Sequence, residues 1–394
     1  MAKSAEEILN DLDLFDPEQG EHMEEALAVA RQKCPVVHST KDGGYYLLTR
    51  YDDVRSVAER PEEFSSAQPA VRGMGIDGVR LIPLDADQPL HRDFRKILNK
   101  YFSLTYVRRH EEKMREICKG LIDKVEMNGH FEFVHDYAIP FTAGVLSHII
   151  FTNETEEFML RAVALVERVA ADLSTEAFLE LGMMALEALN RADESGDDEN
   201  NILSAIKGST IDGGRHMTLE EQMGIVAALL AGGLDTTRSA LANIAFHLAT
   251  RPDVEERLRD PQWVRNDLDE FLRLQPTVSF MARTATCDTT IGDRAFKAGD
   301  RVVLSYLSAN RDESRFENAE ELTFGSDRKV SAAFGLGIHR CIGQHLAKLQ
   351  IEVGFDELLS RLTKFRIEPG AEIPRQIGVS AGAPEHLPLL FERL

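Results

Sequence analysis

The chain has 394 residues, 43% apolar and 28% charged, which is enough to bury one large core. Its 66 acidic residues outnumber 45 basic ones and give a net charge of −21, which argues against nucleic acid or an anionic membrane as a ligand. The first twenty residues are acidic without an apolar run, so we expect no signal peptide or membrane anchor and a cytoplasmic protein.

Helical spacing of apolar residues predicts helices over residues 21–34, 91–101, 111–128, 155–189, 219–250 and 261–274, and a further helical run over 342–358. Short strands are predicted over residues 45–48, 289–291 and 301–304, each next to a glycine-containing turn. The polar stretch 191–201 is too short to separate domains. We therefore predict one large domain, residues 1–394, that is mainly α with small β-sheets.

The segment 334–343 reads F-G-L-G-I-H-R-C-I-G and is followed by Ala347. Its glycines allow tight turns and close approach to a flat ligand. Cys341 precedes an apolar helical run, and a helix N-terminus favours the thiolate. A cysteine beside a glycine-rich turn is more often a buried structural residue, but the full ten-residue pattern favours a ligand role.

This pattern matches every fixed position of F-G-x-G-x-H-x-C-x-G and thus resembles the haem-binding signature of the cytochromes P450. The resemblance implies the α-rich P450 fold and heme b, with Cys341 as the iron ligand and Phe334 and Gly343 at the cofactor. A thiolate ligand favours cleavage of the O–O bond. The family matches run from about residue 91 to residue 347.

A second motif, A-G-G-L-D-T-T over residues 231–237, lies inside the predicted helix 219–250. Paired glycines cost roughly 1 kcal/mol each in a helix interior, so a groove beside a ligand would explain them. The alternative is a helix end, with Gly232-Gly233 as a C-cap and Asp235-Thr236 as the next N-cap. The motif resembles the oxygen-activation motif of the same family, which implies that Asp235 and Thr236 are catalytic and pass protons to dioxygen.

Glu270 and Arg273 stand three residues apart, a spacing that places both on one helix face. Alone, the pair would be an ordinary surface pair. Before Cys341 it resembles the family's buried structural Glu-Arg pair. Arg328 as a third member is doubtful, because the segment before the haem loop is short.

The two haem propionates need cationic or hydrogen-bonding partners. The resemblance implies four: His91, Arg95, Arg283 and His339. Each alone could instead be a solvated charge or a satisfied histidine.

Small residues stand just before and within the glycine pair, and mostly uncharged residues follow Pro276. With the family resemblance they imply an apolar pocket over the haem, although Phe280 and Met281 could equally be packing residues. The predicted substrate-binding residues are Ala228, Ala231, Gly232, Ser279 and Met281. Arg72 or Arg80 could receive a substrate carboxylate.

The favoured function is monooxygenation of a small to medium apolar substrate, by hydroxylation or O-dealkylation. Because the chain shows no flavin or ferredoxin motif, NAD(P)H would act through a separate ferredoxin or flavodoxin and a reductase. The donor is predicted to dock on a basic face formed by Arg92, Lys96, Lys100 and Arg340. The alternatives are a peroxide-using or non-redox haem-thiolate enzyme, and a haem-binding sensor or carrier without turnover.

Overall fold

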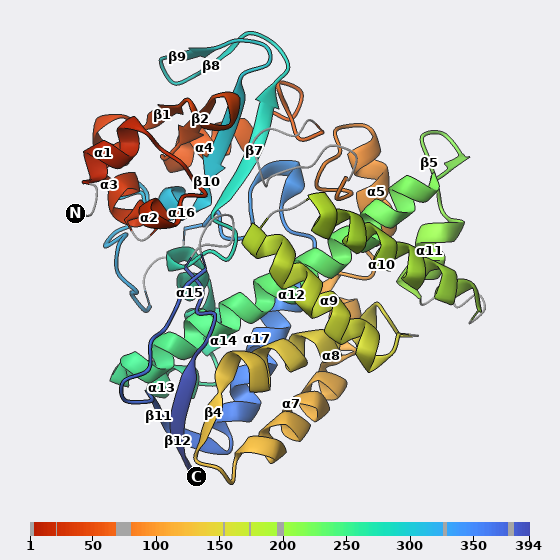
Figure 1. Ribbon diagram of the computed structural model, residues 1–394, viewed down its shortest axis with the longest axis vertical. Helices are drawn as coiled ribbons and strands as arrows, with labels where there is room; N and C mark the ends of the chain where they lie inside the picture. The colour runs from red at the N-terminus through yellow and green to blue at the C-terminus, as the bar shows by residue number, and fades with distance from the viewer. Residues whose placement is uncertain are drawn as a thin grey trace.

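Helix α12 (Leu219–Thr250) runs through the centre of the computed structural model, as Figure 1 shows. A capping box fixes its start: Glu221 N donates to Thr218 Oγ1 (3.2 Å) and Thr218 N donates to Glu221 Oε2 (2.8 Å). By length and composition this helix could cross a membrane, but 72% of its most apolar window is buried inside the fold. It is a core helix, which explains its apolar composition.

The structure describes residues 4–20, 22–67, 80–152, 154–172, 175–194, 201–325, 329–376 and 382–394. Within these ranges, the long helices that pack against α12 or against its neighbours form the α-rich part of the molecule. They are α7 (Glu111–Val125), α8 (Ile139–Ile149), α9 (Glu156–Asp172), α10 (Thr175–Glu194) and α17 (Gln344–Leu359). A π-helical turn, η2 (Phe133–Ala138), leads into α8.

A five-stranded sheet lies on the side of the N-terminus (Figure 1), with the order β1-β2-β10-β7-β3. Its strands are β1 (Val36–Ser39), β2 (Tyr45–Leu48), β10 (Arg301–Ser305), β7 (Phe280–Ala285) and β3 (Phe64–Ser65). β10 is parallel to β2, and the other pairs are antiparallel. Helices α1 (Ala5–Asn10), α2 (Pro17–Gly20), α3 (Met23–Lys33), α4 (Tyr51–Ala58) and α16 (Tyr306–Ala309) lie on this side.

A three-stranded sheet joins the C-terminal strand to the middle of the chain, in the order β11 (Leu362–Ile367), β12 (Pro388–Arg393), β4 (His130–Glu132). Pro388 faces Glu132 in its register. Two small hairpins are β5 (Thr210–Ile211) with β6 (Arg215–His216), and β8 (Thr289–Ile291) with β9 (Arg294–Phe296).

Short helices complete the described fold. They are α5 (Leu90–Leu98), α6 (Leu104–Arg108), α11 (Ile202–Gly208), α13 (Pro252–Leu258), α14 (Trp263–Asn266), α15 (Leu268–Leu274), η1 (Lys41–Gly43) and η3 (Gly337–His339).

The predicted class, mainly α with small sheets in one domain, is confirmed, and the helix over 219–250 has the predicted bounds. The single helix predicted over 155–189 is wrong, because α9 and α10 are separate helices. Both helices bury an apolar face, so apolar residues recur at helical spacing from α9 into α10, and this spacing does not reveal the break between them. The predicted helix 261–274 is likewise two short ones, α14 and α15.

Candidate functional site

The loop before α17 carries Cys341 and is shaped by its glycines. Cys341 N donates to Phe334 O (2.8 Å), which closes the loop on itself. Gly337 has a φ of +66°, and a Cβ there would lie 1.9 Å from the carbonyl oxygen of Ala58, at the end of α4. No side chain fits at that position, because a left-handed backbone and a backbone contact coincide.

The Cys341 sulfur sits at the N-terminal end of α17. Its side chain has an accessible face, but the protein around it is close enough that burial raises the pKa of the thiol. The N–H groups of Gly343 and Gln344 and the charges of Arg95 and Arg340 act in the opposite direction and favour the thiolate. The same donors would stabilise a thiolate bound to a metal.

Two histidines and two arginines gather next to this loop. The rings of His91 and His339 are 4.4 Å apart, and Arg95 Nη1 donates to Arg340 O (2.9 Å). Burial, with the charges of Arg95 and Arg283, lowers the pKa of His91 to about 4. For His339, burial and the charge of Arg283 hold the pKa well below its usual range. Both imidazoles are therefore neutral at pH 7.

This group has unfilled hydrogen-bonding capacity. Within the described residues, both ring nitrogens of His91 are buried without a partner, and no carboxylate lies within ion-pair distance of Arg283 or Arg95. The Arg283 guanidinium is buried, and Nη1 donates to Ala282 O (2.6 Å). His339 Nε2 is 3.0 Å from Ser66 Oγ. Buried cations and orphan donors of this kind suit an anionic ligand.

The glycine pair of α12 lies inside an unbroken helix, so the alternative of a helix end is wrong. A Cβ on Gly233 would lie 2.6 Å from Leu146 Cδ1, whereas a Cβ on Gly232 would meet nothing within 4 Å. Gly233 thus allows close packing on α8, and Gly232 faces open space. Thr236 Oγ1 donates to Gly232 O (2.7 Å) beside that space.

Asp235 is buried and points away from free solvent. Arg238 Nη2 donates to its Oδ1 (2.7 Å), and Gln376 Nε2 approaches the same oxygen at 3.4 Å. Ser239 Oγ is 3.2 Å from Gln376 Oε1. The carboxylate is therefore held by partners from α12 and from the C-terminal segment.

A small pocket brings the separate sequence motifs together. Its walls come from α12, the end of α15, the cysteine loop and α17. The lining residues are Thr236, Thr237, Ala240, Leu272, Pro276, Thr277, Ala333, Phe334, Ala347 and Ile351. The walls are mostly apolar, with threonine hydroxyls from α12 and from Thr277.

Glu270 and Arg273 form a buried ion pair with two contacts, Nε to Oε2 (2.8 Å) and Nη2 to Oε1 (2.7 Å). Arg273 also donates to the carbonyls of Asn310, Ala319 and Glu321. Asn310 Oδ1 in turn accepts from Ala332 N (2.6 Å), just before the cysteine loop. The pair thus supports the segment that leads into that loop.

The predicted substrate-binding residues differ in exposure. Gly232 is exposed, and Ala228, Ala231 and Met281 are half-buried. Ser279 is fully buried and its hydroxyl has no partner within the described residues. Its carbonyl accepts from the N–H groups of Tyr306 and Leu307 at the start of α16, and its role in substrate binding stays a prediction.

Arg80 is directed to the carbonyl oxygen of Asp85. Arg72 and Arg328 lie outside the described residues.

Several residues at this site escaped the sequence prediction, namely Ala58, Ser66, Arg238, Asn310 and Gln376. Only Arg238 carried a local signal, its spacing of three from Asp235 on a predicted helix.

The family model for Cytochrome P450 matches residues 184–261 and 263–382, half of the chain. Cytochrome P450 130 of Mycobacterium tuberculosis is 32% identical over 338 residues, covering 82% of this chain and 83% of that protein. The chain belongs to the cytochrome P450 family. Nocardicin C N-oxygenase of Nocardia uniformis is 31% identical over 369 residues, covering 88% of this P450 and 89% of the relative.

Solved P450 structures share the fold. CYP101J2 superimposes with a TM-score of 0.83 at 26% identity, covering 97% of this chain and 96% of the other. A mutant of P450 EryK in complex with erythromycin B gives a TM-score of 0.84 at 22% identity, covering 94% and 96% of the two chains. This protein is therefore a haem-thiolate monooxygenase of the bacterial type with heme b as its cofactor, supplied with electrons from NAD(P)H through redox partners.

The residues present fit that cofactor. A cysteine at a helix N-terminus offers a thiolate ligand to iron. The orphan nitrogens of His91 and the buried charge of Arg283 suit carboxylate groups such as the propionates. Gly232 leaves open space on the opposite wall.

Proposed function

We propose that this P450 oxidises a compact, neutral, apolar molecule by hydroxylation or O-dealkylation, with electrons from a separate ferredoxin or flavodoxin. The observation that carries the proposal is the mostly apolar lining between α12 and the cysteine loop, where Thr236 and Phe334 border one small pocket. Such walls favour an uncharged substrate, since burial of apolar surface supplies roughly 25 cal/mol per Å².

In this proposal Cys341 is the iron ligand, and His91, Arg95, Arg283 and His339 hold the propionates, with Phe334 and Gly343 against the macrocycle. When bound, heme b supplies the chemistry of O2 activation and oxygen insertion. The protein's own part is to hold the thiolate, exclude water and deliver protons. A cytoplasmic location remains a prediction.

Thr236 is the proposed hydrogen-bond acceptor beside the substrate. Its hydroxyl hydrogen is directed to Gly232 O (2.7 Å), so the oxygen presents its lone pairs to the open space. A group there can accept a hydrogen bond from a protonated species. Asp235 is held by Arg238, so it must leave that partner and take up a proton from water before it can pass one to Thr236.

Substitution of Thr236 by Ala tests this role. We expect NADH consumption, measured with a surrogate ferredoxin system, to continue at a similar rate, while product per NADH falls and hydrogen peroxide rises. The control is Thr250→Ala, because Thr250 makes the same bond to a carbonyl four residues earlier on α12 (2.7 Å) but is exposed at the helix end. Equal product per NADH in Thr236→Ala and the parent would contradict the proposal.

The substrate class is tested by titrating the ferric enzyme with a panel of compounds and following the haem spectrum. Neutral compact apolar molecules should shift the spin state at the lowest concentrations. A response to charged fatty acids or peptides alone would overturn the assignment. The ligand assignment is tested by Cys341→His, which should lose the carbonyl band near 450 nm that the thiolate gives.

The basic face, defined by Arg92, Lys96, Lys100 and Arg340, is the proposed docking site for the electron donor. All four side chains are exposed. Within the described residues none of them has a carboxylate within ion-pair distance, so their charge is available to a partner. Arg340 adjoins Cys341 in the chain, so the proposed face would lie next to the proposed iron ligand.

The double variant Arg92→Glu/Lys96→Glu should slow first electron transfer, most strongly at low salt, and leave the substrate-induced spin shift intact. The matched control reverses two exposed charges elsewhere, Lys124 on α7 and Arg265 on α14, for the same change in net charge. If the first electron reaches both variants at the same rate, the donor docks on another surface. Product formed with hydrogen peroxide but never with the donor would favour the peroxide-using alternative.

A further inference from the structure

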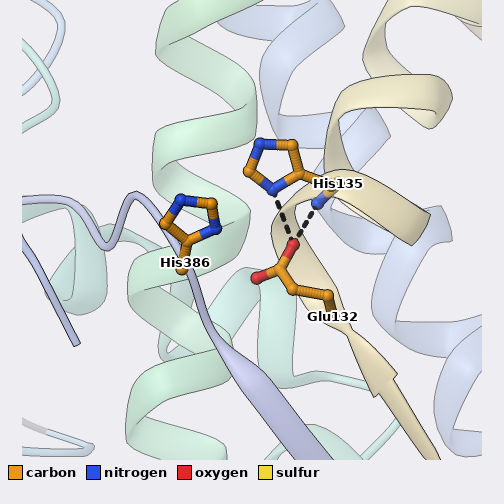
Figure 2. A group of neighbouring side chains, drawn as sticks. All are labelled: Glu132, His135 and His386. Carbon is orange, nitrogen blue, oxygen red and sulfur yellow. Dashed lines mark hydrogen bonds and ion pairs between the residues drawn. The ribbon is translucent and has the colours of Figure 1, made fainter. Parts of the chain in front are cut away.

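A glutamate and two histidines meet on the surface, and none of them lines the pocket between α12 and the cysteine loop. Glu132 ends β4, His135 lies in η2, and His386 lies just before β12. Figure 2 shows the three side chains converging from the two segments. We call them the β4–β12 cluster.

The geometry of the cluster is compact. Glu132 Oε2 accepts from His135 N (2.6 Å) and lies 2.7 Å from His135 Nδ1. The rings of His135 and His386 are stacked, with centroids 4.7 Å apart and planes at 16°. One ligand atom from each of the three residues lies within 4.8 Å of the other two.

We propose that the β4–β12 cluster binds a divalent transition-metal ion, with Zn²⁺ as the representative. Two imidazoles and one carboxylate are borderline and hard ligands that suit Zn²⁺, Ni²⁺ and Cu²⁺ better than Mg²⁺ or Ca²⁺. Three protein ligands leave the fourth tetrahedral position to water.

Small side-chain movements suffice to complete the site. Ligand bonds of about 2.0–2.2 Å in a tetrahedron place the ligand atoms roughly 3.3 Å apart, and the three atoms now lie within 4.8 Å of one another, so the widest gap must close by no more than roughly 1.5 Å. His135 and His386 are exposed, and rotation of their rings costs little packing. The Glu132–His135 hydrogen bond would be replaced by two bonds to the ion.

The carboxylate is already oriented by the backbone. Leu387 N donates to Glu132 Oε1, while His135 N donates to Oε2. These two amides come from the two segments that the ion would join, and Asp136 Oδ2 accepts from Glu132 N (2.8 Å). Hydrogen bonds to a ligating carboxylate fix its direction and raise metal affinity. The bound ion would therefore tie β4 and η2 to the segment before β12.

The test is calorimetric titration of the tag-free, haem-loaded, chelator-stripped enzyme with ZnCl2. Cys34 and Cys287 are exposed thiols, so both are replaced by Ser in every protein compared. We expect one saturable site with micromolar affinity. His386→Ala and Glu132→Gln should each weaken it at least tenfold, whereas His216→Ala, which removes an exposed histidine on β6, should leave it unchanged.

Two results would overturn the proposal: no saturable binding by the parent, or equal affinity in the parent and His386→Ala. His386 is exposed, so this variant should fold, and its melting temperature without metal should match the parent. Glu132 is also a hydrogen-bond acceptor for two amides, so His386→Ala remains decisive if Glu132→Gln proves unstable. Zinc should raise the melting temperature of the parent and not of His386→Ala.

Discussion

Loss of the Arg273 guanidinium should destabilise this P450 more than loss of any exposed ion pair. Arg273 and Glu270 side chains are only 4% and 15% exposed. Removing one partner of a buried pair costs about 3–5 kcal/mol, because the other charge stays buried and unpaired. Arg273→Gln would also release the carbonyls of Asn310, Ala319 and Glu321, at about 1 kcal/mol or more for each carbonyl that water does not reach.

Against a typical net stability of about 5–15 kcal/mol, this loss is roughly a fifth or more of the total. The assay is urea unfolding of the haem-loaded enzyme, followed by circular dichroism and by the Soret band. The control is Arg55→Gln, since Arg55 and Glu59 form an exposed pair with both side chains 49% exposed, worth under about 1 kcal/mol. Equal losses in the two variants would refute the reasoning.

Three further predictions concern single groups. Gly337→Ala should abolish haem incorporation, measured as Soret absorbance per protein, because the new Cβ would lie 1.9 Å from Ala58 O. The control Gly370→Ala should retain haem, because Gly370 also has a positive φ but has nothing within 4 Å of its Cβ position. Burial lowers the folded-state pKa of His247 to about 4 from 6.5. The contribution of this neutral histidine to stability is therefore complete above pH 6.5 and is lost as the pH falls toward 4. Over that range the unfolding free energy of the parent should drop more steeply than that of His247→Gln. A thiol reagent should modify the exposed Cys34 and Cys287 in the native holoenzyme and spare Cys118, which is fully buried with its pKa raised by burial to about 12; rapid reaction of a third thiol in the native protein would contradict this.

The sequence predicted best those features that are encoded locally. The start of α12 follows from Thr218 and Glu221, a capping box that is visible in the sequence. The strands Tyr45–Leu48 and Thr289–Ile291 were also predicted within their observed limits, since each adjoins a glycine turn. The ten-residue pattern around Cys341 identified the family by itself.

Features that depend on distant residues were not predictable. β7 was missed because it carries Arg283 and is buried along most of its length, so it lacks the alternation of a half-exposed strand. The carbonyl of Ser279 accepts from Tyr306 N and Leu307 N, a contact between separate segments that no local pattern shows. In the β4–β12 cluster, Glu132 and His386 are about 250 residues apart in the chain, and only the E-x-x-H spacing of Glu132 and His135 is visible locally.

The close contact of Gly337 with Ala58 has a consequence for the order of events during synthesis. The loop that presents Cys341 packs against α4, which is synthesised nearly 300 residues earlier. The same loop also forms hydrogen bonds with Arg95 and Ser66. Contacts of such long sequence separation form late, because the chain between them must first be ordered. Haem capture should therefore be one of the last steps of maturation, and chains released from the ribosome before residue 341 will lack the spectrum that reports a finished enzyme.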